Sequence, residues 1–173
     1  MNYWLEADPE EILDEVILAR QLAGEDLDET SSAARKMVLG DIRSAQASLL
    51  REVVEVDGMV PVFRSIRLET DQIDGFENKG LGTCWAFSRA GAFAYDGRRS
   101  GVELIMEARV APDDIAWPMV IGMWSSGEGE ARLAGNAVVL LDRILTRDGD
   151  PVREDMWGGE YSADRRLAAD RKP

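Results

Sequence analysis

The sequence predicts an α+β fold in which two N-terminal helices pack on a split, mostly antiparallel β-sheet, with a ligand cleft between its halves. Apolar residues recur with a helical period up to residue 58 and alternate in the manner of strands after it. The chain has 173 residues, of which 45% are hydrophobic, so a core forms without disulfide bonds. We expect a helical segment at 1–58, a sheet core at 59–147 and a charged, loosely ordered tail at 148–173.

Two helices account for the N-terminal segment. The first is expected to begin near residue 9, with Asp8 as its N-cap, and to end at Gly24. The second is expected to begin after Thr30 or Ser31 and to end at residues 57–58. Both carry apolar residues three or four positions apart, which is typical of helices that bury one face.

Strands are expected where apolar and polar residues alternate. Such alternation covers residues 60–68 and 102–110, and a nearly continuous apolar run covers 137–145. Between the first two, residues 80–87 resemble a short strand that leads through Ser88 into a small helix. The order of helices followed by strands favours an α+β class over alternating βα units.

The negative charge is concentrated at the start of the chain. The formal net charge is −13, and the first 30 residues contain ten acidic residues against Arg20 alone. A solvated acidic helix face explains this run, and a docking surface for a basic partner is the alternative. An acidic protein is a poor candidate for binding nucleic acid, because phosphate recognition needs a basic surface.

The composition excludes several kinds of chemistry. The chain has no histidine, which removes Ser-His-Asp and Cys-His catalysis and histidine zinc sites. Its single cysteine, Cys84, forms no internal disulfide and no thiolate zinc site, so we expect no metal and a reducing, cytoplasmic setting. No apolar stretch approaches the length of a membrane span, and the N-terminus does not resemble a secretory signal.

Arg64 is the first residue that the pattern singles out. Strand alternation puts it on the same face as Val62 and Ile66, where a permanently charged guanidinium needs a partner. A structural carboxylate is one such partner. A phosphate-bearing ligand is the other, because the planar guanidinium matches phosphate oxygens in pairs.

A Glu-x-Glu pair is the second candidate. In an extended segment Glu128 and Glu130 project from one face, and Arg132 continues the row. Neighbouring carboxylates repel, which raises the pKa of one of them and suits the pair to acid, base or cation-stabilising work. A solvated edge strand is the alternative interpretation.

The segment between the first two long strands offers weaker signals. Thr83 and Trp85 share one strand face, while Cys84 lies on the other and reads as a small core residue. Ser88 is expected to be the N-cap of the following helix, with a catalytic hydroxyl as the alternative. The glycines beside Leu81 lack the length and the helix context of a phosphate-binding fingerprint.

In their order and spacing, these segments resemble the ADP-ribosyltransferase-like superfamily, and in particular its arginine–serine–glutamate class of bacterial toxins and phage proteins. The resemblance covers about residues 60 to 145. The segments that carry it are Val-Phe-Arg-Ser-Ile-Arg-Leu at 62–68, Leu-Gly-Thr-Cys-Trp-Ala at 81–86 with its following helix, residues 103–117, and Glu-Gly-Glu-Ala-Arg-Leu at 128–133.

The resemblance implies roles for the arginine and the two glutamates. Arg64 would hold NAD through its phosphate and ribose. Glu130 would hydrogen-bond the nicotinamide ribose and stabilise the cation that forms as nicotinamide leaves. Glu128 would orient the acceptor guanidinium.

The central strand departs from the family pattern. The family carries a Ser-Thr-Ser or similar hydroxyl motif there, whereas this chain offers hydroxyls only at Thr83 and Ser88. With Trp85, these residues are the remaining candidates for contact with NAD. The departure also suits a copy of the fold that has lost catalysis.

Three functions follow as alternatives. The first is NAD-dependent transfer of ADP-ribose to a protein, with arginine as the favoured acceptor. The second is a catalytically inactive fold that serves as a binding or structural protein of a phage or mobile element. The third is an interaction module that works through its acidic helices, with the sheet as scaffold.

Overall fold

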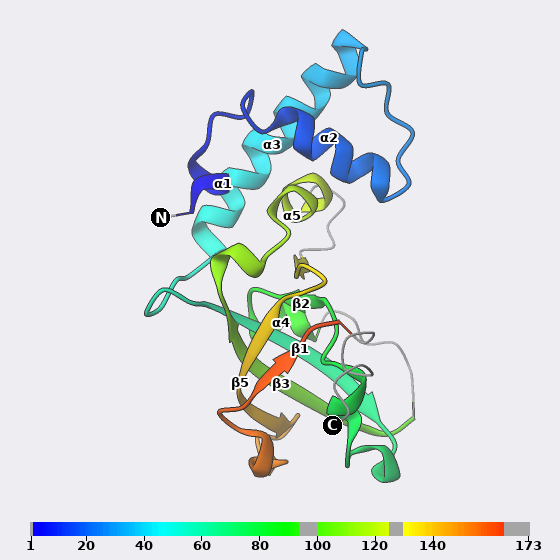
Figure 1. The fold of residues 1–173 in the computed structure, drawn as a ribbon, viewed down its shortest axis with the longest axis vertical. Helices are drawn as coiled ribbons and strands as arrows, with labels where there is room; N and C mark the ends of the chain where they lie inside the picture. Colours follow the sequence, from blue (N-terminus) through cyan, green and yellow to red (C-terminus); the bar gives the residue numbers. More distant parts are fainter. Residues whose placement is uncertain (1, 94–99, 125–129, 165–173) are drawn as a thin grey trace. The chain divides into compact units, whose positions relative to one another are not determined.

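The computed structural model describes residues 2–93, 100–124 and 130–164, and its architecture is α+β (Figure 1). The chain divides into two compact units, one formed by residues 1–53 and 116–130 and the other by 54–115 and 131–173. This division differs from the segments expected from the sequence. Residues 116–130, which were assigned to the sheet core, belong to the helical unit.

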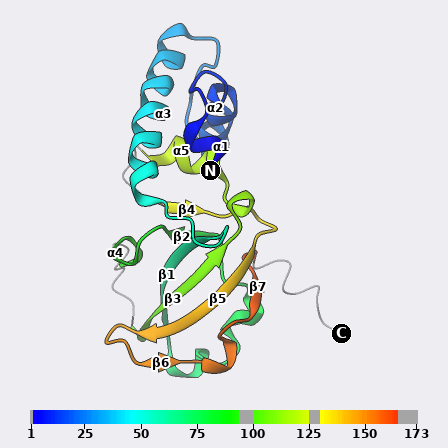
Figure 2. The same ribbon diagram turned by 90° about the vertical axis from the view of Figure 1, so that its left-hand side faces the viewer.

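The helical unit is built around its longest helix. Helix α3 (Ser32–Glu52) contacts α1 (Tyr3–Glu6), α2 (Leu13–Leu22) and α5 (Trp117–Met123), as Figure 2 shows. None of the helices in the described part of the chain is long and apolar enough to cross a membrane. The core of the unit consists of buried aliphatic side chains and one tryptophan, among them Leu5, Ile12, Val16, Val38, Ile42, Leu49, Trp117 and Ile121.

The helix ends follow local capping chemistry. The Ser31 hydroxyl accepts the backbone N–H of Ala34 at 3.3 Å, which confirms the predicted start of α3. The predicted N-cap of the first helix is wrong. The Asp8 carboxylate instead accepts the N–H of Glu10 at 3.0 Å in a turn, and α2 begins only at Leu13.

A buried charge lies inside the helical unit. Arg20 on α2 donates to Glu25 at 2.5 and 2.7 Å and to Asp41 on α3 at 2.7 Å. The hydrogen bond from Arg20 lowers the pKa of Glu25 below its usual value, despite partial burial. Gly122 on α5 makes room for this arginine, because a Cβ there would lie 3.0 Å from Arg20 Cγ.

The described strands form one seven-stranded sheet around three long antiparallel strands: β1 (Val60–Leu68), β3 (Val102–Val110) and β5 (Val138–Thr146). The order is β4-β2-β1-β3-β5-β6, with β7 also paired to β5. The short strands are β2 (Cys84–Ala86), β4 (Glu130–Arg132), β6 (Pro151–Val152) and β7 (Glu160–Ser162).

The sheet is continuous, whereas a split sheet with a cleft between its halves was expected from the sequence. Its narrowest described connection joins β1 to β2, which pair at Phe63↔Ala86, whereas β1 and β3 pair along their full length. Helix α4 (Arg89–Ala92) contributes Ala92 to an apolar cluster on one face of this sheet. The rest of that cluster is Ala86, Ile105 and Leu145, packed against Phe63, Phe93 and Trp157.

Residues 151–163 are part of the sheet unit. Residues from 148 were expected to form a loosely ordered tail, but β6 and β7 both pair with β5, and Met156 and Ala163 are buried. The Ala163 N–H donates to the Ala137 carbonyl at 3.0 Å. The prediction is therefore wrong for residues 151–163, where backbone pairing with β5 compensates for the low apolar content.

Candidate active site

Arg64 lies in the middle of β1, on the strand face that carries Val62 and Ile66 and opposite the face of the Phe63 cluster. It pairs with Met106 of β3, and both Met106 and its own neighbour Val62 are buried. The strand parity inferred from the sequence is thus confirmed. Its guanidinium Nη1 donates to the carbonyl oxygen of Leu81 at 2.7 Å. A backbone carbonyl, which has no formal charge, is therefore one of its partners.

The segment that receives Arg64 contains two glycines in left-handed backbone conformations. The φ angles of Gly80 and Gly82 are +75° and +86°, values that L side chains rarely adopt. A Cβ on Gly82 would lie 1.7 Å from Arg64 Nη1 and 2.6 Å from Cζ. The guanidinium thus occupies the space that any other residue at position 82 would need.

Trp85 supports this segment from β2. Its side chain is buried, and its indole Nε1 donates to the carbonyl of Gly82 at 2.8 Å. The Leu81 N–H donates to the Ser162 carbonyl of β7 at 3.0 Å, so the segment is anchored on two sides. The contact with NAD suggested for Trp85 stays a prediction, and here the ring holds the backbone that holds Arg64.

The two candidate hydroxyls occupy different surroundings. Thr83 directly precedes β2, is half-buried, and accepts the Leu133 N–H on its backbone carbonyl at 2.8 Å. Ser88 is exposed, and its hydroxyl accepts the Gly91 N–H at 3.0 Å as the N-cap of α4. The capping interpretation of Ser88 is confirmed, while contact of either hydroxyl with NAD stays a prediction.

Strand β4 carries the candidate carboxylate. Glu130 and Arg132 are half-buried, and Ala131 between them is fully buried, as strand alternation requires. Arg132 Nη1 donates to the thiol sulfur of Cys84 on β2. Cys84 is half-buried, so the expectation of a core residue is wrong. Glu128 lies outside the described residues.

The sheet order makes the candidate strands neighbours, but strand parity places their side chains on opposite faces. Because Phe63 pairs with Ala86, Cys84 and its partner Arg132 lie on the face opposite Arg64 and Trp85, and Glu130 shares the face of Arg132. Strands β4, β2 and β1 are consecutive neighbours, and they carry Glu130, the segment after Thr83, and Arg64. Glu130 is the last residue of the helical unit, and Arg132 already belongs to the sheet unit.

Comparison of the chain with family models, with curated proteins and with solved structures gave no match.

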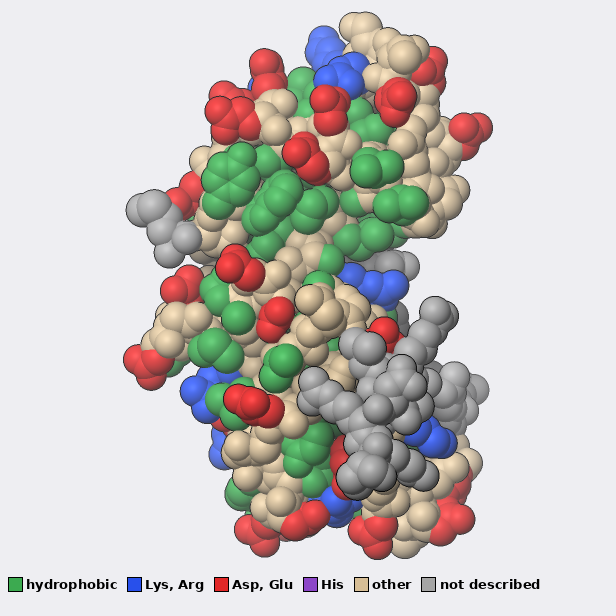
Figure 3. All heavy atoms as spheres, viewed as in Figure 1, with side chains coloured by type: hydrophobic (Ala, Val, Ile, Leu, Met, Phe, Trp, Pro, Cys, Tyr) green, Lys and Arg blue, Asp and Glu red, His purple; other side chains and the backbone are tan. Residues whose placement is uncertain are grey.

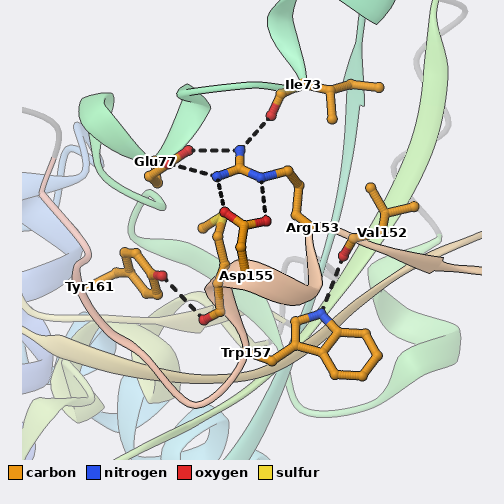
Figure 4. Close-up of polar contacts among 8 residues, drawn as sticks. Ile73, Glu77, Val152, Arg153, Asp155, Trp157 and Tyr161 are labelled. Carbon is orange, nitrogen blue, oxygen red and sulfur yellow. Dashed lines mark hydrogen bonds and ion pairs between the residues drawn. The ribbon is translucent and has the colours of Figure 1, made fainter.

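A second polar cluster, which the sequence analysis missed, surrounds Arg153 (Figure 4). Arg153 donates to the Glu77 carboxylate at 2.9 and 3.2 Å, to Asp155 at 2.9 and 2.8 Å, and to the Ile73 carbonyl at 2.8 Å. These bonds join the loop after β1 to the segment after β6. Because Glu77 and Arg153 are 76 positions apart, no local pattern in the sequence indicates the pair.

The charges in this cluster shift one another's protonation. Burial alone would raise the pKa of Glu77, but hydrogen bonds from Arg153 and the backbone lower it. The hydrogen bond from Arg153 also lowers the pKa of Asp155. Burial, followed by the nearby charges of Glu77 and Asp155, raises the pKa of Tyr161, whose hydroxyl donates to the Met156 carbonyl at 3.1 Å. The cluster therefore connects the loop at residues 73–77 to the segment that follows β6.

Proposed function

We propose that the protein binds NAD and transfers its ADP-ribose group to an arginine side chain of an acceptor protein. The observation that carries the proposal is the fixed guanidinium of Arg64, held by the Leu81 carbonyl on the otherwise apolar face of β1. Two phosphates in NAD match a guanidinium fork, and an arginine on a strand is more rigid than one on a loop.

The reaction is a displacement at the anomeric carbon of the nicotinamide ribose. The bond from this carbon to the nicotinamide nitrogen breaks, and its electron pair leaves with nicotinamide. A nitrogen of the acceptor guanidinium then bonds to the same carbon and loses one proton. Positive charge develops on the ribose between these events, so a preorganised carboxylate stabilises the transition state.

Glu130 is the carboxylate proposed for this task. It lies on β4, one strand beyond β2 in the sheet order. The resemblance to the arginine–serine–glutamate class supports this assignment and gives Glu128 the separate task of orienting the acceptor. A guanidinium held in a bidentate pair is in position to attack, which lowers the entropic cost of the reaction.

NAD binding and nicotinamide release test the proposal directly. Calorimetric titration should detect NAD binding to the wild type, and the Arg64→Gln variant should bind at least about tenfold more weakly. The control is Arg147→Gln, which removes an exposed arginine of the same unit and should leave NAD affinity unchanged. Failure of the wild type to bind NAD would contradict the proposal.

A catalytically inactive NAD-binding or structural protein is the second candidate. It is favoured by the use of the Ser88 hydroxyl as a helix cap and of the Trp85 indole as an internal donor, since both are then engaged within the protein. NAD binding without nicotinamide release, in the presence of an arginine-rich acceptor, would select this function.

The acceptor is proposed to dock on the exposed face of α2 and the turn before it. Glu11, Asp14 and Glu15 are exposed there, beside Leu18 and Leu22, which are 55% and 75% exposed. Figure 3 displays acidic and hydrophobic side chains side by side on the helical unit. Such a surface fits a basic protein segment with an apolar side.

A further inference from the structure

The backbone at Leu81–Gly82 forms a seat for the Arg64 guanidinium. The Leu81 carbonyl accepts from Nη1, and the missing side chain of Gly82 provides the space for the planar group. The seat is itself fixed, because the Gly82 carbonyl accepts the Trp85 indole N–H and the Leu81 N–H donates to Ser162.

Gly82 differs from other left-handed glycines of the chain in what surrounds it. Gly24, Gly58, Gly149 and Gly158 also have positive φ angles, between +75° and +97°, and a Cβ on any of them would meet no atom within 4 Å. At Gly82 the same Cβ would overlap three atoms of one charged side chain. Backbone conformation alone explains the first four glycines, whereas Gly82 also meets a steric requirement of Arg64.

We propose that Gly82 is a positioning residue for NAD binding. Because it has no side chain, the Arg64 guanidinium can lie against the Leu81 carbonyl, in the position from which it binds the pyrophosphate. This inference rests on the proposed function and adds a residue to it. A side chain at position 82 would push the guanidinium off the Leu81 carbonyl, and the arginine would then have to be reoriented each time NAD binds.

The test compares Gly82→Ala with Gly149→Ala. Both substitutions place a side chain at a positive φ, +86° and +95°, but only the first meets Arg64. For Gly82→Ala we expect the NAD dissociation constant and KM to rise at least about tenfold, with kcat at saturating NAD changed less than about threefold, because Glu130 is untouched. Gly149→Ala should bind NAD like the wild type. Equal affinity of the two variants would overturn the inference.

A double variant shows whether Gly82 acts through Arg64. In an Arg64→Ala background the overlapping atoms are gone, so adding Gly82→Ala should weaken NAD binding no further. A further tenfold loss would mean that Gly82 acts independently of the arginine, which would overturn the inference. A wild type that binds no NAD would instead remove the proposed function itself, so the two failures are distinguishable.

Folding of the variants gives a second readout that needs no NAD. If Gly82→Ala fails to fold, Arg64→Ala/Gly82→Ala should still fold, because the Cβ then has space. Recovery of the folded circular dichroism spectrum in the double variant would support the seat. Failure of both, with Gly149→Ala folded, would reduce Gly82 to a backbone requirement and overturn the positioning role.

Discussion

Among single residues, Glu130 is the one whose substitution should reduce the proposed reaction most. It is half-buried on β4, and the neighbouring Ala131 is fully buried, which anchors the strand backbone at this point. Preorganisation of this kind makes a carboxylate effective against a charge that develops only in the transition state.

Glu130→Gln should therefore reduce kcat for nicotinamide release by at least about 100-fold and leave NAD affinity within about threefold. The amide keeps the shape of the side chain but removes the charge that stabilises the ribosyl cation. Nicotinamide release and calorimetry on the same preparation provide the two values. Glu160→Gln, which alters an exposed carboxylate on β7, is the matched control. Unchanged turnover in Glu130→Gln would rule out its catalytic role.

Glu128 separates acceptor choice from cleavage of NAD. Glu128→Gln should largely abolish labelling of protein arginine while sparing much of the hydrolysis of NAD by water, because water needs no bidentate clamp. Protein labelling and nicotinamide release, measured on one sample, decide the outcome. Parallel loss of both activities would assign Glu128 to NAD binding. Retention of both would return it to the solvated surface, where its replacement costs at most about 0.5 kcal/mol of stability.

At the scale of elements, the sequence was informative where one local signal dominated. The strands at β1, β3 and β5 and the start of α3 at Ser31 could be predicted, because alternation and an N-cap are read within a few residues. The start of α2 was misplaced because Asp8 caps a turn as readily as a helix.

The environment of the candidate site was less predictable than its strands. Strand parity placed Arg64 on the same face as Val62 and Ile66, but one of its partners is a carbonyl 17 positions away, which no residue type reveals. The role of Gly82 depends equally on a side chain from another strand. Cys84 was expected in the core, yet it meets Arg132 of β4, a contact that depends on strand order and not on local pattern.

The exposed face of α2 gives a prediction for this scale. Glu11→Lys/Glu15→Lys should raise KM for a basic acceptor protein several-fold, to about tenfold at low salt, and leave NAD hydrolysis unchanged, because only the docking charge is reversed. Asp148→Lys/Glu160→Lys makes the same change in net charge at exposed positions of the sheet unit and serves as the control. An equal effect of both pairs would indicate a general charge effect and not a docking surface.

At the scale of the whole molecule, the response to pH depends on the carboxylates. The chain has no histidine, so no side chain with an ordinary pKa changes charge between about pH 6 and 8. Glu25, Glu77 and Asp155 have pKa values lowered in the folded protein. Their stabilising contribution is present above the pKa of the unfolded chain and is lost as the pH falls through the lowered values.

The free energy of unfolding should therefore be nearly constant from about pH 6 to 8 and fall below about pH 5. Arg153→Gln should destabilise the protein at neutral pH, since it removes the charged hydrogen bonds to the half-buried Glu77 and to Asp155, and should flatten the acid dependence. Urea unfolding at several pH values measures both effects. Lys79→Gln removes an exposed cation from the same loop and should change neither. An acid dependence in Arg153→Gln as steep as in the wild type would contradict the prediction.

The return of residues 116–130 to the helical unit has a consequence for synthesis of the protein. Helix α3 ends at Glu52, but α5, which supplies the buried Trp117 and Ile121 of the same core, begins only at residue 117. As the chain leaves the ribosome, α1, α2 and α3 are synthesised first. More than sixty further residues, including β1 and β3, are added before their last packing partner, α5, emerges. The nascent helical unit keeps an apolar surface open throughout that interval, which is when it most needs protection from aggregation.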